Sequence, residues 1–356
     1  MEKEDAGIAG RIAELRSRLG KRVAIPAHHY QRPEVVALSD IVADSYKLAL
    51  WASKADAPYI VHCGVRFMAE SAAILAREGQ VVLVPDPVAG CPMADMLDAE
   101  SAESAMRAIE AVRGVAPAPV VYMNSTAETK ALTGRSGGSI CTSSNARFVL
   151  ESYFERGVPV FFGPDRNLGV NTAREMGIDP KLIFSIGRRG DIAGGGDPSV
   201  GLLYLWDGYC HVHRRFTLGD VAAARARDEK IRVIVHPECG EDVVRASDMS
   251  GSTEALAAAL RDGEPGSSWA VGTEANFVRR LAAELPDRTI VPLRESYCFN
   301  MARIDLTNLF ASLESVAAHE IDPTVPLLHP VTVPPAMKVD AAKALNTMIA
   351  ITEKRR

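Results

Sequence analysis

Three of the six cysteines lie in turn-like stretches of small or aromatic residues, at Cys91, Cys210 and Cys298. No two cysteines have the short Cys-x-x-Cys spacing of a zinc ribbon or a ferredoxin, so the tertiary fold would have to assemble any metal site. Cys210 also precedes His213 by three residues, and this pair could supply half of a zinc site whose other half the sequence does not identify. The cysteines can therefore be interpreted either as metal ligands or as small buried hydrophobic residues.

Groups that could transfer protons follow two of the expected strands. His28 and Tyr30 come after an apolar stretch at 22–27, and His236 and Glu238 come after one at 231–235. Imidazole, phenol and carboxyl groups are common general acids and bases, and Tyr122 is a further phenol of this kind. Hydroxyls suited to carboxylate or phosphate oxygens are found at Ser45, Ser143, Ser252 and Thr253. Each of these side chains could equally cap a helix or satisfy a buried hydrogen bond.

Short apolar strands alternate with helix-like segments, and this pattern starts again twice along the chain. The expected strands are 22–27, 59–63, 81–84, 119–123, 139–141, 158–162, 231–235, 270–272 and 289–291, and the expected helices include 8–19, 68–76 and 99–113. The alternation predicts an α/β fold of three similar units with mostly parallel sheets, in which ligands bind at the carboxyl ends of the strands. We place the units at 1–98, 99–216 and 217–356, so that each holds one of the three cysteines above.

Two segments carry strong turn signals. Cys91 lies in a bend between Gly90 and Pro92, and Pro92 suits the first position of a helix. The segment 187–198 is rich in glycine and charged residues and predicts a mobile loop. It lacks the preceding strand and the following Lys-Ser or Lys-Thr of a phosphate-binding loop, which argues against that function.

The composition points to a protein that acts on small molecules. A chain of 356 residues suggests two or three domains, and a formal net charge of -5 gives no electrostatic signature for nucleic acid or an anionic membrane. The first residues lack the pattern of a signal peptide, and no apolar run is long enough to span a bilayer. We therefore expect a cytoplasmic protein whose cysteines are reduced.

Ten short motifs follow one another over most of the chain. They are Ala27–Gln31, Gly90–Ala94, Tyr122–Thr126, Cys141–Ala146, Phe162–Gly169, Gly208–His213, His236–Cys239, Gly251–Thr253, Gly272–Glu274 and Cys298–Met301. In this order they resemble the quinolinate synthases of bacterial and archaeal NAD biosynthesis. The resemblance implies three α/β domains in a pseudo-threefold arrangement, with the active site at their common interface.

The resemblance also implies a cofactor and a reaction. One [4Fe-4S] cluster would be held by Cys91, Cys210 and Cys298, and its fourth iron would stay open and act on the substrate as a Lewis acid. The family is a transferase that condenses iminoaspartate with dihydroxyacetone phosphate and releases quinolinate, phosphate and water. Iminoaspartate would come from the oxidation of aspartate, which suggests functional coupling to L-aspartate oxidase.

Residue roles follow from the same motifs. The resemblance implies that His28 and Tyr30 bind the triose-derived part of the substrate and transfer its protons. It also implies that Glu238 is the general base. The residues that would bind the substrate's carboxylates, phosphate or other polar groups are Ser45, Tyr122, Asn124, Ser143, Asn145, His236, Ser252 and Thr253. Two departures stand out: His29 replaces an asparagine that is common in the family, and 187–200 resembles an insertion.

Two alternatives belong to other functional classes. A zinc-dependent lyase or aldolase could act on triose phosphate through Cys210, His213 and further ligands. A non-catalytic protein could bind phosphorylated metabolites and keep its cysteines buried.

Overall fold

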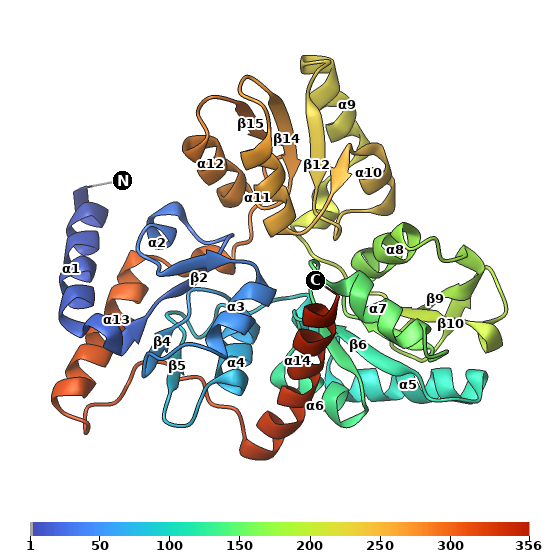
Figure 1. The fold of residues 1–356 in the computed structure, drawn as a ribbon, viewed down its shortest axis with the longest axis horizontal. Helices are drawn as coiled ribbons and strands as arrows, with labels where there is room; N and C mark the ends of the chain where they lie inside the picture. Colours follow the sequence, from blue (N-terminus) through green and yellow to red (C-terminus); the bar gives the residue numbers. More distant parts are fainter. Residues whose placement is uncertain (1–2, 356) are drawn as a thin grey trace. The chain divides into compact units, whose positions relative to one another are not determined.

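The computed structural model describes residues 3–355, which form two compact units. The first unit contains the described residues up to Cys91 together with Tyr297–Pro334, and the second contains Pro92–Ser296 and Pro335 onward. Figure 1 shows the helices and strands of both units. The architecture is α/β with mostly parallel sheets, as the sequence predicts. The three predicted domain boundaries and the pseudo-threefold arrangement remain predictions.

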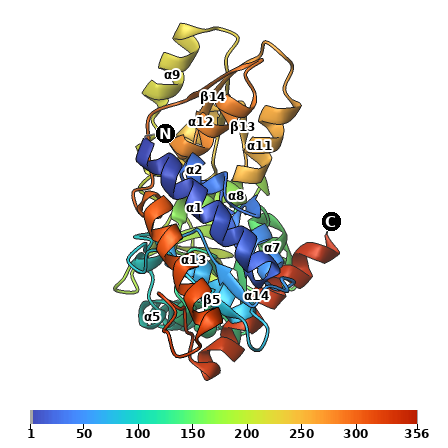
Figure 2. The same cartoon turned by 90° about the vertical axis from the view of Figure 1, so that its left-hand side faces the viewer.

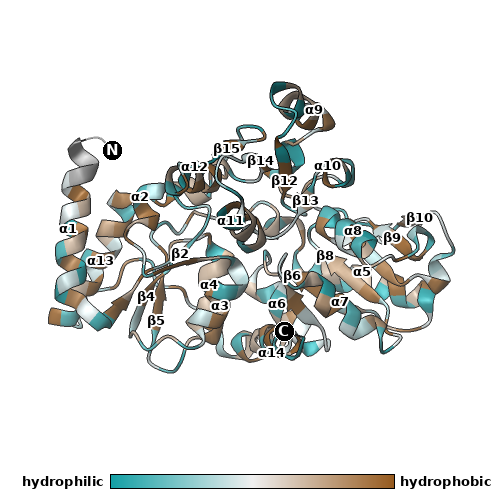
Figure 3. Ribbon diagram, turned by 45° about the horizontal axis from the view of Figure 1, so that its top comes forward, coloured by the Kyte–Doolittle hydropathy of each residue, from teal (hydrophilic) through white to brown (hydrophobic). Residues whose placement is uncertain are grey.

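The first unit is built on two small parallel sheets. One sheet has the order β1-β4-β5 (Val23–Ala24, Tyr59–Val61, Val81–Leu83), and the other pairs β2 with β3 (Pro26–His28, Ile41–Ala43). Its helical elements are α1 (Lys3–Leu19), η1 (Gly20–Arg22), α2 (Pro33–Val36), α3 (Ser45–Ala52), α4 (Arg66–Leu75), η6 (Met301–Arg303) and α13 (Leu306–Ile321). β4 and β5 are coloured as hydrophobic in Figure 3, in keeping with their buried positions.

Helices α1 and α13 lie side by side although they are distant in sequence (Figures 1 and 2). Ile12 of α1 and Leu313 and Val316 of α13 are fully buried in one core cluster with Ile25. The helix that the sequence predicts at 8–19 is therefore part of α1, and its apolar face packs on α13. Asp305 starts α13 with a capping box, because its side chain accepts from Asn308 N and the Asn308 side chain accepts from Asp305 N.

The second unit contains a larger sheet and a smaller one. The larger sheet has the order β10-β9-β11-β8-β6-β7, with strands at Ile192–Gly194, Ile183–Ile186, Leu203–Trp206, Val160–Gly163, Ala118–Tyr122 and Ser139–Cys141. The smaller is parallel with the order β13-β12-β14-β15, at Met249–Ser250, Arg232–Val235, Ser268–Gly272 and Thr289–Pro292. Only the β9–β10 pair is antiparallel among the strand pairs of the described residues.

Helices connect these strands. The helical elements are η2 (Ala94–Met96), α5 (Ala99–Arg113), α6 (Ala127–Arg135), α7 (Ala146–Phe154), α8 (Arg166–Glu175), η3 (Pro180–Leu182), η4 (Pro198–Val200), η5 (His213–Arg215), α9 (Leu218–Arg227), α10 (Glu241–Ala246), α11 (Thr253–Asp262), α12 (Ala275–Glu284) and α14 (Pro335–Lys354). Side chains cap the first turns of α5, α6, α8, α9, α11 and α12. α14 packs closely on α6, because Gly134 has no side chain and a Cβ there would lie 1.9 Å from Asp340 O.

Two local predictions are wrong. The expected strand at 22–27 is two strands, because Ile25 N donates to Asp40 Oδ2 at 2.7 Å between them and they pair with different partners. Instead of a helix from Pro92 there is only the turn η2, which ends where the extended Leu97 enters the core.

The segment 187–198, which the sequence predicts as a mobile loop, contains one short strand. Ile192–Gly194 forms β10, paired with β9 across a turn at Gly190, which has φ +77°. Gly194 leaves room for the Phe184 ring, since a Cβ would come within 2.4 Å of its Cδ1. Among residues 3–355, no helix is both long and apolar enough to cross a membrane.

Candidate active site and metal ligands

The carboxyl group of Glu238 is held at both oxygens inside the second unit. Glu238 follows β12 and is 3% exposed. Tyr122, the last residue of β6, donates its hydroxyl to Glu238 Oε1 at 2.6 Å. His213 Nδ1 lies 2.7 Å from Oε2. The strand ends of two different sheets therefore meet at one buried carboxyl group.

His213 extends this network on its other side. Its Nε2 lies 3.0 Å from the hydroxyl of Thr273, which follows β14. The imidazole of His213 stacks on that of His236, with ring centroids 4.4 Å apart and planes 20° apart. His236 Nε2 in turn lies 3.2 Å from the hydroxyl of Ser143. The chain thus brings together Tyr122, Ser143, His236 and Glu238, all predicted from the sequence.

The site favours an ionised carboxyl group at Glu238 next to a neutral imidazole at His236. Burial alone would raise the pKa of the Glu238 carboxyl, but the interaction with His213 and the hydrogen bond from Tyr122 hold the pKa below its usual range. Burial, followed by the charge of His213, lowers the pKa of His236 to about 3. The structure therefore favours an ionised Glu238 beside a neutral His236 near neutral pH.

Asp165 fixes the loop that carries Cys210. Its Oδ1 accepts from Leu168 N at 2.7 Å, which caps α8, and its Oδ2 accepts from Cys210 N at 3.1 Å. Arg166 N also donates to Gly208 O at 2.9 Å, so two hydrogen bonds join the start of α8 to the loop that carries Cys210. Burial, and then the charge of Glu238, raises the pKa of Asp165. The result is a Cys210 backbone held by a fully buried side chain.

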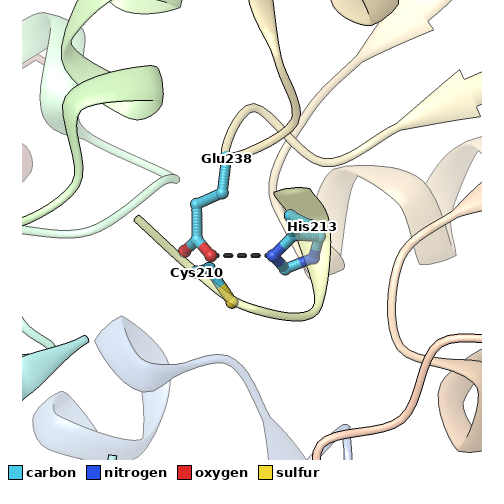
Figure 4. Close-up of side chains that lie close together, drawn as sticks. All are labelled: Cys210, His213 and Glu238. Carbon is cyan, nitrogen blue, oxygen red and sulfur yellow. Dashed lines mark hydrogen bonds and ion pairs between the residues drawn. The ribbon is translucent and has the colours of Figure 1, made fainter. Parts of the chain in front are cut away.

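Cys210, His213 and Glu238 form a group that could hold a metal ion (Figure 4). One potential ligand atom from each residue lies within 4.8 Å of those of the other two. In Figure 4 the ends of the three side chains converge, and the imidazole is hydrogen-bonded to the carboxylate. The half zinc site suspected from the spacing of Cys210 and His213 thus has a third candidate ligand.

A cleft of about 600 Å³ opens near this network within the second unit. Ser143, Asn145 and Ser252 are among its lining residues, as are the guanidinium-bearing Arg174 and Arg245. Hydroxyls and guanidinium groups suit carboxylate or phosphate oxygens. The hydroxyl and guanidinium groups that line the cleft are therefore suited to binding an anion.

Some predicted binding residues have structural contacts of their own. Ser252 caps α11 by accepting from Ala255 N at 3.3 Å, and Thr253 begins that helix and is buried. The Asn145 amide accepts from Thr142 N at 2.7 Å and donates to Thr352 of α14 at 3.0 Å. Asn124, after β6, is half-buried. Helix capping and substrate binding are compatible for Ser252, and the Asn145 amide carries a second N–H group besides the one that bonds Thr352.

The remaining predicted residues belong to the first unit. The His28 ring, at the end of β2, meets the Tyr30 ring edge-on with centroids 4.7 Å apart, and Tyr30 N donates to His28 Nδ1 at 3.2 Å. His29 also lies edge-on to His28, at 6.3 Å. Ser45 begins α3 directly after its cap Asp44, whose side chain accepts from Lys47 N. His28, His29 and Tyr30 thus form a compact group at the end of β2, and Ser45 follows the neighbouring strand β3.

Comparisons with known proteins decide the family. Residues 10–350 match the family model described as quinolinate synthetase A protein. Proteins named quinolinate synthase from Bacillus velezensis and Bacillus subtilis are 42% and 41% identical to the chain, and each alignment covers 96% of the chain and 92% of the relative. One from a Geobacillus species is 42% identical with the same coverage. The chain belongs to the quinolinate synthase family. It is therefore an enzyme, and the resemblance drawn from the ten motifs is confirmed.

The six cysteines of this quinolinate synthase family member divide into two sets. Cys91, Cys210 and Cys298 are partly exposed, whereas Cys63, Cys141 and Cys239 are buried. Burial raises the pKa of the thiols of Cys63, Cys141 and Cys239, which keeps them protonated. Metal ligation needs a thiolate, so the partly exposed set fits the metal or iron–sulfur cofactor that the family implies.

Three residues of the site were not recognised from the sequence as partners. His213 stood out only through its spacing from Cys210, while Thr273 and Asp165 were included only within longer motifs. Their contacts with Glu238, His213 and Cys210 join segments that are distant along the chain. The available signal was their position in the motifs Gly208–His213, Gly272–Glu274 and Phe162–Gly169.

Proposed function

We propose that this enzyme condenses iminoaspartate with dihydroxyacetone phosphate and forms quinolinate, phosphate and water. The family supports this proposal over a zinc-dependent lyase and over a non-catalytic binding protein. The observation that carries it is the buried Glu238 carboxylate, held between Tyr122 and His213 and close to Cys210. A base, a proton donor and a potential metal ligand are thus available in one place.

The proposed cofactor is a [4Fe-4S] cluster on Cys91, Cys210 and Cys298. Their partial exposure and the fixed backbone of Cys210 support the assignment. When bound, the cluster would supply a Lewis-acidic iron. Thiolates are the soft ligands that such clusters prefer, which a serine hydroxyl does not replace.

The chain's own groups would position the substrates and move protons. Glu238 would accept a proton from the substrate through Oε1 or Oε2, and Tyr122 would hold the carboxylate in place and donate a hydrogen bond to it. His236 is neutral near pH 7, so it would bind a carboxylate as a hydrogen-bond donor from Nε2 rather than as a cation.

Anion binding would use the hydroxyl and amide groups at strand and helix ends. We propose that Ser143, His236, Ser252 and Thr253, with Asn124 and Asn145, bind carboxylates or phosphate, and that Ser45 does so in the first unit. His28 and Tyr30 would bind the triose-derived part and transfer its protons. The α11 N-terminus at Ser252 adds backbone N–H groups for an anion.

Anaerobic purification followed by an assay tests the proposal. A brown protein with about four irons and four sulfides per chain, which forms quinolinate from dihydroxyacetone phosphate and iminoaspartate, is the expected result. Iminoaspartate is best generated in the assay by L-aspartate oxidase, its proposed functional partner. A colourless zinc protein that cleaves triose phosphates, or a metal-free protein that binds them without turnover, would contradict the proposal.

A further inference from the structure

The group Cys210, His213 and Glu238 presents a sulfur, a nitrogen and an oxygen atom within 4.8 Å of one another (Figure 4). These are the three kinds of ligand that Zn²⁺ takes from proteins, and a site with three protein ligands keeps a fourth position for water. His213 and Glu238 are 1% and 3% exposed, whereas Cys210 is partly exposed. The imidazole and the carboxylate are therefore buried, and Cys210 is the partly exposed member of the group.

Each ligand in this group is oriented by a further partner. Thr273 Oγ1 lies 3.0 Å from His213 Nε2 and leaves Nδ1 directed at the carboxylate. Tyr122 donates to Glu238 Oε1, which leaves Oε2 as the ligand atom. Asp165 accepts from Cys210 N and fixes the thiol-bearing loop. Outer contacts of this kind are typical of protein zinc sites, because they orient the ligands before the metal arrives.

The geometry needs only a small adjustment to admit an ion. His213 Nδ1 and Glu238 Oε2 are now 2.7 Å apart and share a hydrogen bond. Two ligands of a tetrahedral zinc ion lie about 3.4 Å apart, so the pair would separate by less than about 1 Å. Such a movement is within reach of side-chain rotation alone.

We propose that the cluster-free protein binds one Zn²⁺ at Cys210, His213 and Glu238, and that this ion blocks cluster assembly. The block follows because zinc and the cluster would both need the Cys210 thiolate, so the second half of the inference rests on the proposed function. Zinc binds mixed nitrogen, oxygen and sulfur sites more tightly than Fe²⁺ does. An apoprotein exposed to both metals would therefore fill this site with zinc first.

The test starts from full-length protein stripped of its cluster under anaerobic conditions. Zn²⁺ is titrated against a chromophoric chelator, and Co²⁺ serves as a spectroscopic substitute. One Zn²⁺ per chain is expected, and Co²⁺ should give a thiolate charge-transfer band together with the absorption of a tetrahedral ion. Absence of zinc binding, or a cobalt spectrum without a thiolate band, would overturn the site.

Four variants separate zinc from the cluster. His213→Gln should weaken zinc binding by more than about 100-fold, because losing a ligand exceeds the 10- to 100-fold cost of losing an outer partner. It should still take up cluster iron on reconstitution. Cys91→Ser should bind zinc but fail to take up cluster iron. Cys210→Ser should bind neither zinc nor cluster iron. Cys141→Ser, a matched buried cysteine of the same unit, should keep both.

A milder variant covers the case in which His213→Gln fails to fold. Thr273→Val removes only the hydroxyl next to His213 Nε2 and should weaken zinc binding about 10- to 100-fold. Unchanged zinc affinity in Thr273→Val and in any folded His213→Gln would overturn the ligand assignment. Unchanged cluster uptake by zinc-loaded wild-type protein would overturn the competition.

The outcomes also separate this inference from the proposed function. If wild-type protein takes up about four irons and forms quinolinate but its apoprotein does not bind zinc, only the zinc site is wrong. If it binds zinc at these residues but never takes up iron, the zinc site stands and the proposed function falls.

Discussion

The six cysteines fall into two sets of three that differ in burial. Cys141 ends β7, and Cys63 and Cys239 follow β4 and β12, and all three are fully buried. Cys91, Cys210 and Cys298 lie in loops and are partly exposed. Burial raises the pKa of the Cys63, Cys141 and Cys239 thiols and disfavours the thiolate that a metal needs. Burial separates the two sets better than position in a loop does, because Cys239 also lies between β12 and α10 and is fully buried.

The largest difference between the two sets should appear in iron content. Cys210→Ser should lose nearly all cluster iron, because a hydroxyl is a poor ligand for iron and Asp165 already fixes the backbone around it. Cys141→Ser, in the same unit, should retain its iron. The check is iron and sulfide analysis of both variants after anaerobic reconstitution. Normal iron content in Cys210→Ser would remove Cys210 from the ligand set.

The next largest effect concerns the carboxylate beside the loop cysteine. Glu238→Gln should slow turnover about 100- to 10,000-fold, because the amide keeps the shape of the carboxylate but cannot accept a proton. Cluster iron and the thermal midpoint should stay close to wild type, since an amide oxygen can still accept from Tyr122. Single-turnover kinetics and thermal unfolding measure the two effects. A lower midpoint with unchanged turnover would make Glu238 a structural residue.

The free energy of unfolding should depend more on the buried cysteines than on the partly exposed ones, which is the opposite of the order expected for iron content. In cluster-free protein, Cys141→Ser should lower the free energy of unfolding by about 1–3 kcal/mol, because it places a hydroxyl in an enclosed apolar position. Cys298→Ser should change it by less than about 0.5 kcal/mol, because its site is partly exposed. Urea unfolding of both variants gives the comparison. Equal losses would mean that enclosure does not distinguish the two sets.

An exposed segment without a cysteine tests whether exposure alone implies function. Deleting Gly190–Gly196 removes the turn and β10, whose residues are mostly exposed. We expect a stability loss of about 1 kcal/mol or less and turnover within about twofold of wild type. Steady-state kinetics and urea unfolding of the deletion variant are the measurements. A selective loss of turnover with the fold intact would instead make this segment a lid over the active site.

The smallest expected effect concerns an exposed glutamate, as a contrast to the buried Glu238. Hydrogen bonds from Arg22, followed by that from Tyr59, lower the pKa of Glu320 from 4.5 to about 2. A lowered folded-state pKa contributes stability above pH 4.5 that is lost as the pH falls toward 2. Glu320→Gln should therefore be slightly destabilising at pH 7 and nearly neutral at pH 2, with a small size because the ion pair is exposed.

Unfolding of cluster-free wild-type and Glu320→Gln protein at both pH values measures this dependence. A destabilisation that is the same at pH 7 and pH 2 would mean that the ionised carboxylate is not the source of the effect. The matched measurement on Glu238→Gln is not a control here, because Glu238 is part of the candidate active site.

Local signals were enough to predict many elements and several site residues. The expected helix at 99–113 matches α5, because Asp98 caps its first turn and Gly114 ends it with φ 75°. The strand at 139–141 matches β7, a short buried run between turn residues. Tyr122, Ser143, His236 and Glu238 stood out because each follows or ends an apolar strand, and this position needs no knowledge of the tertiary fold.

The sequence by itself determined the α/β character, the family and the residue types at the strand ends, because these depend on local periodicity and on motifs in a fixed order. Only the tertiary structure decided which of those residues touch. The contact of His213 with Glu238 spans 25 residues, and that of Tyr122 with Glu238 spans 116. Which thiols are enclosed was decided in the same way, since burial depends on the packing of segments that are far apart along the chain.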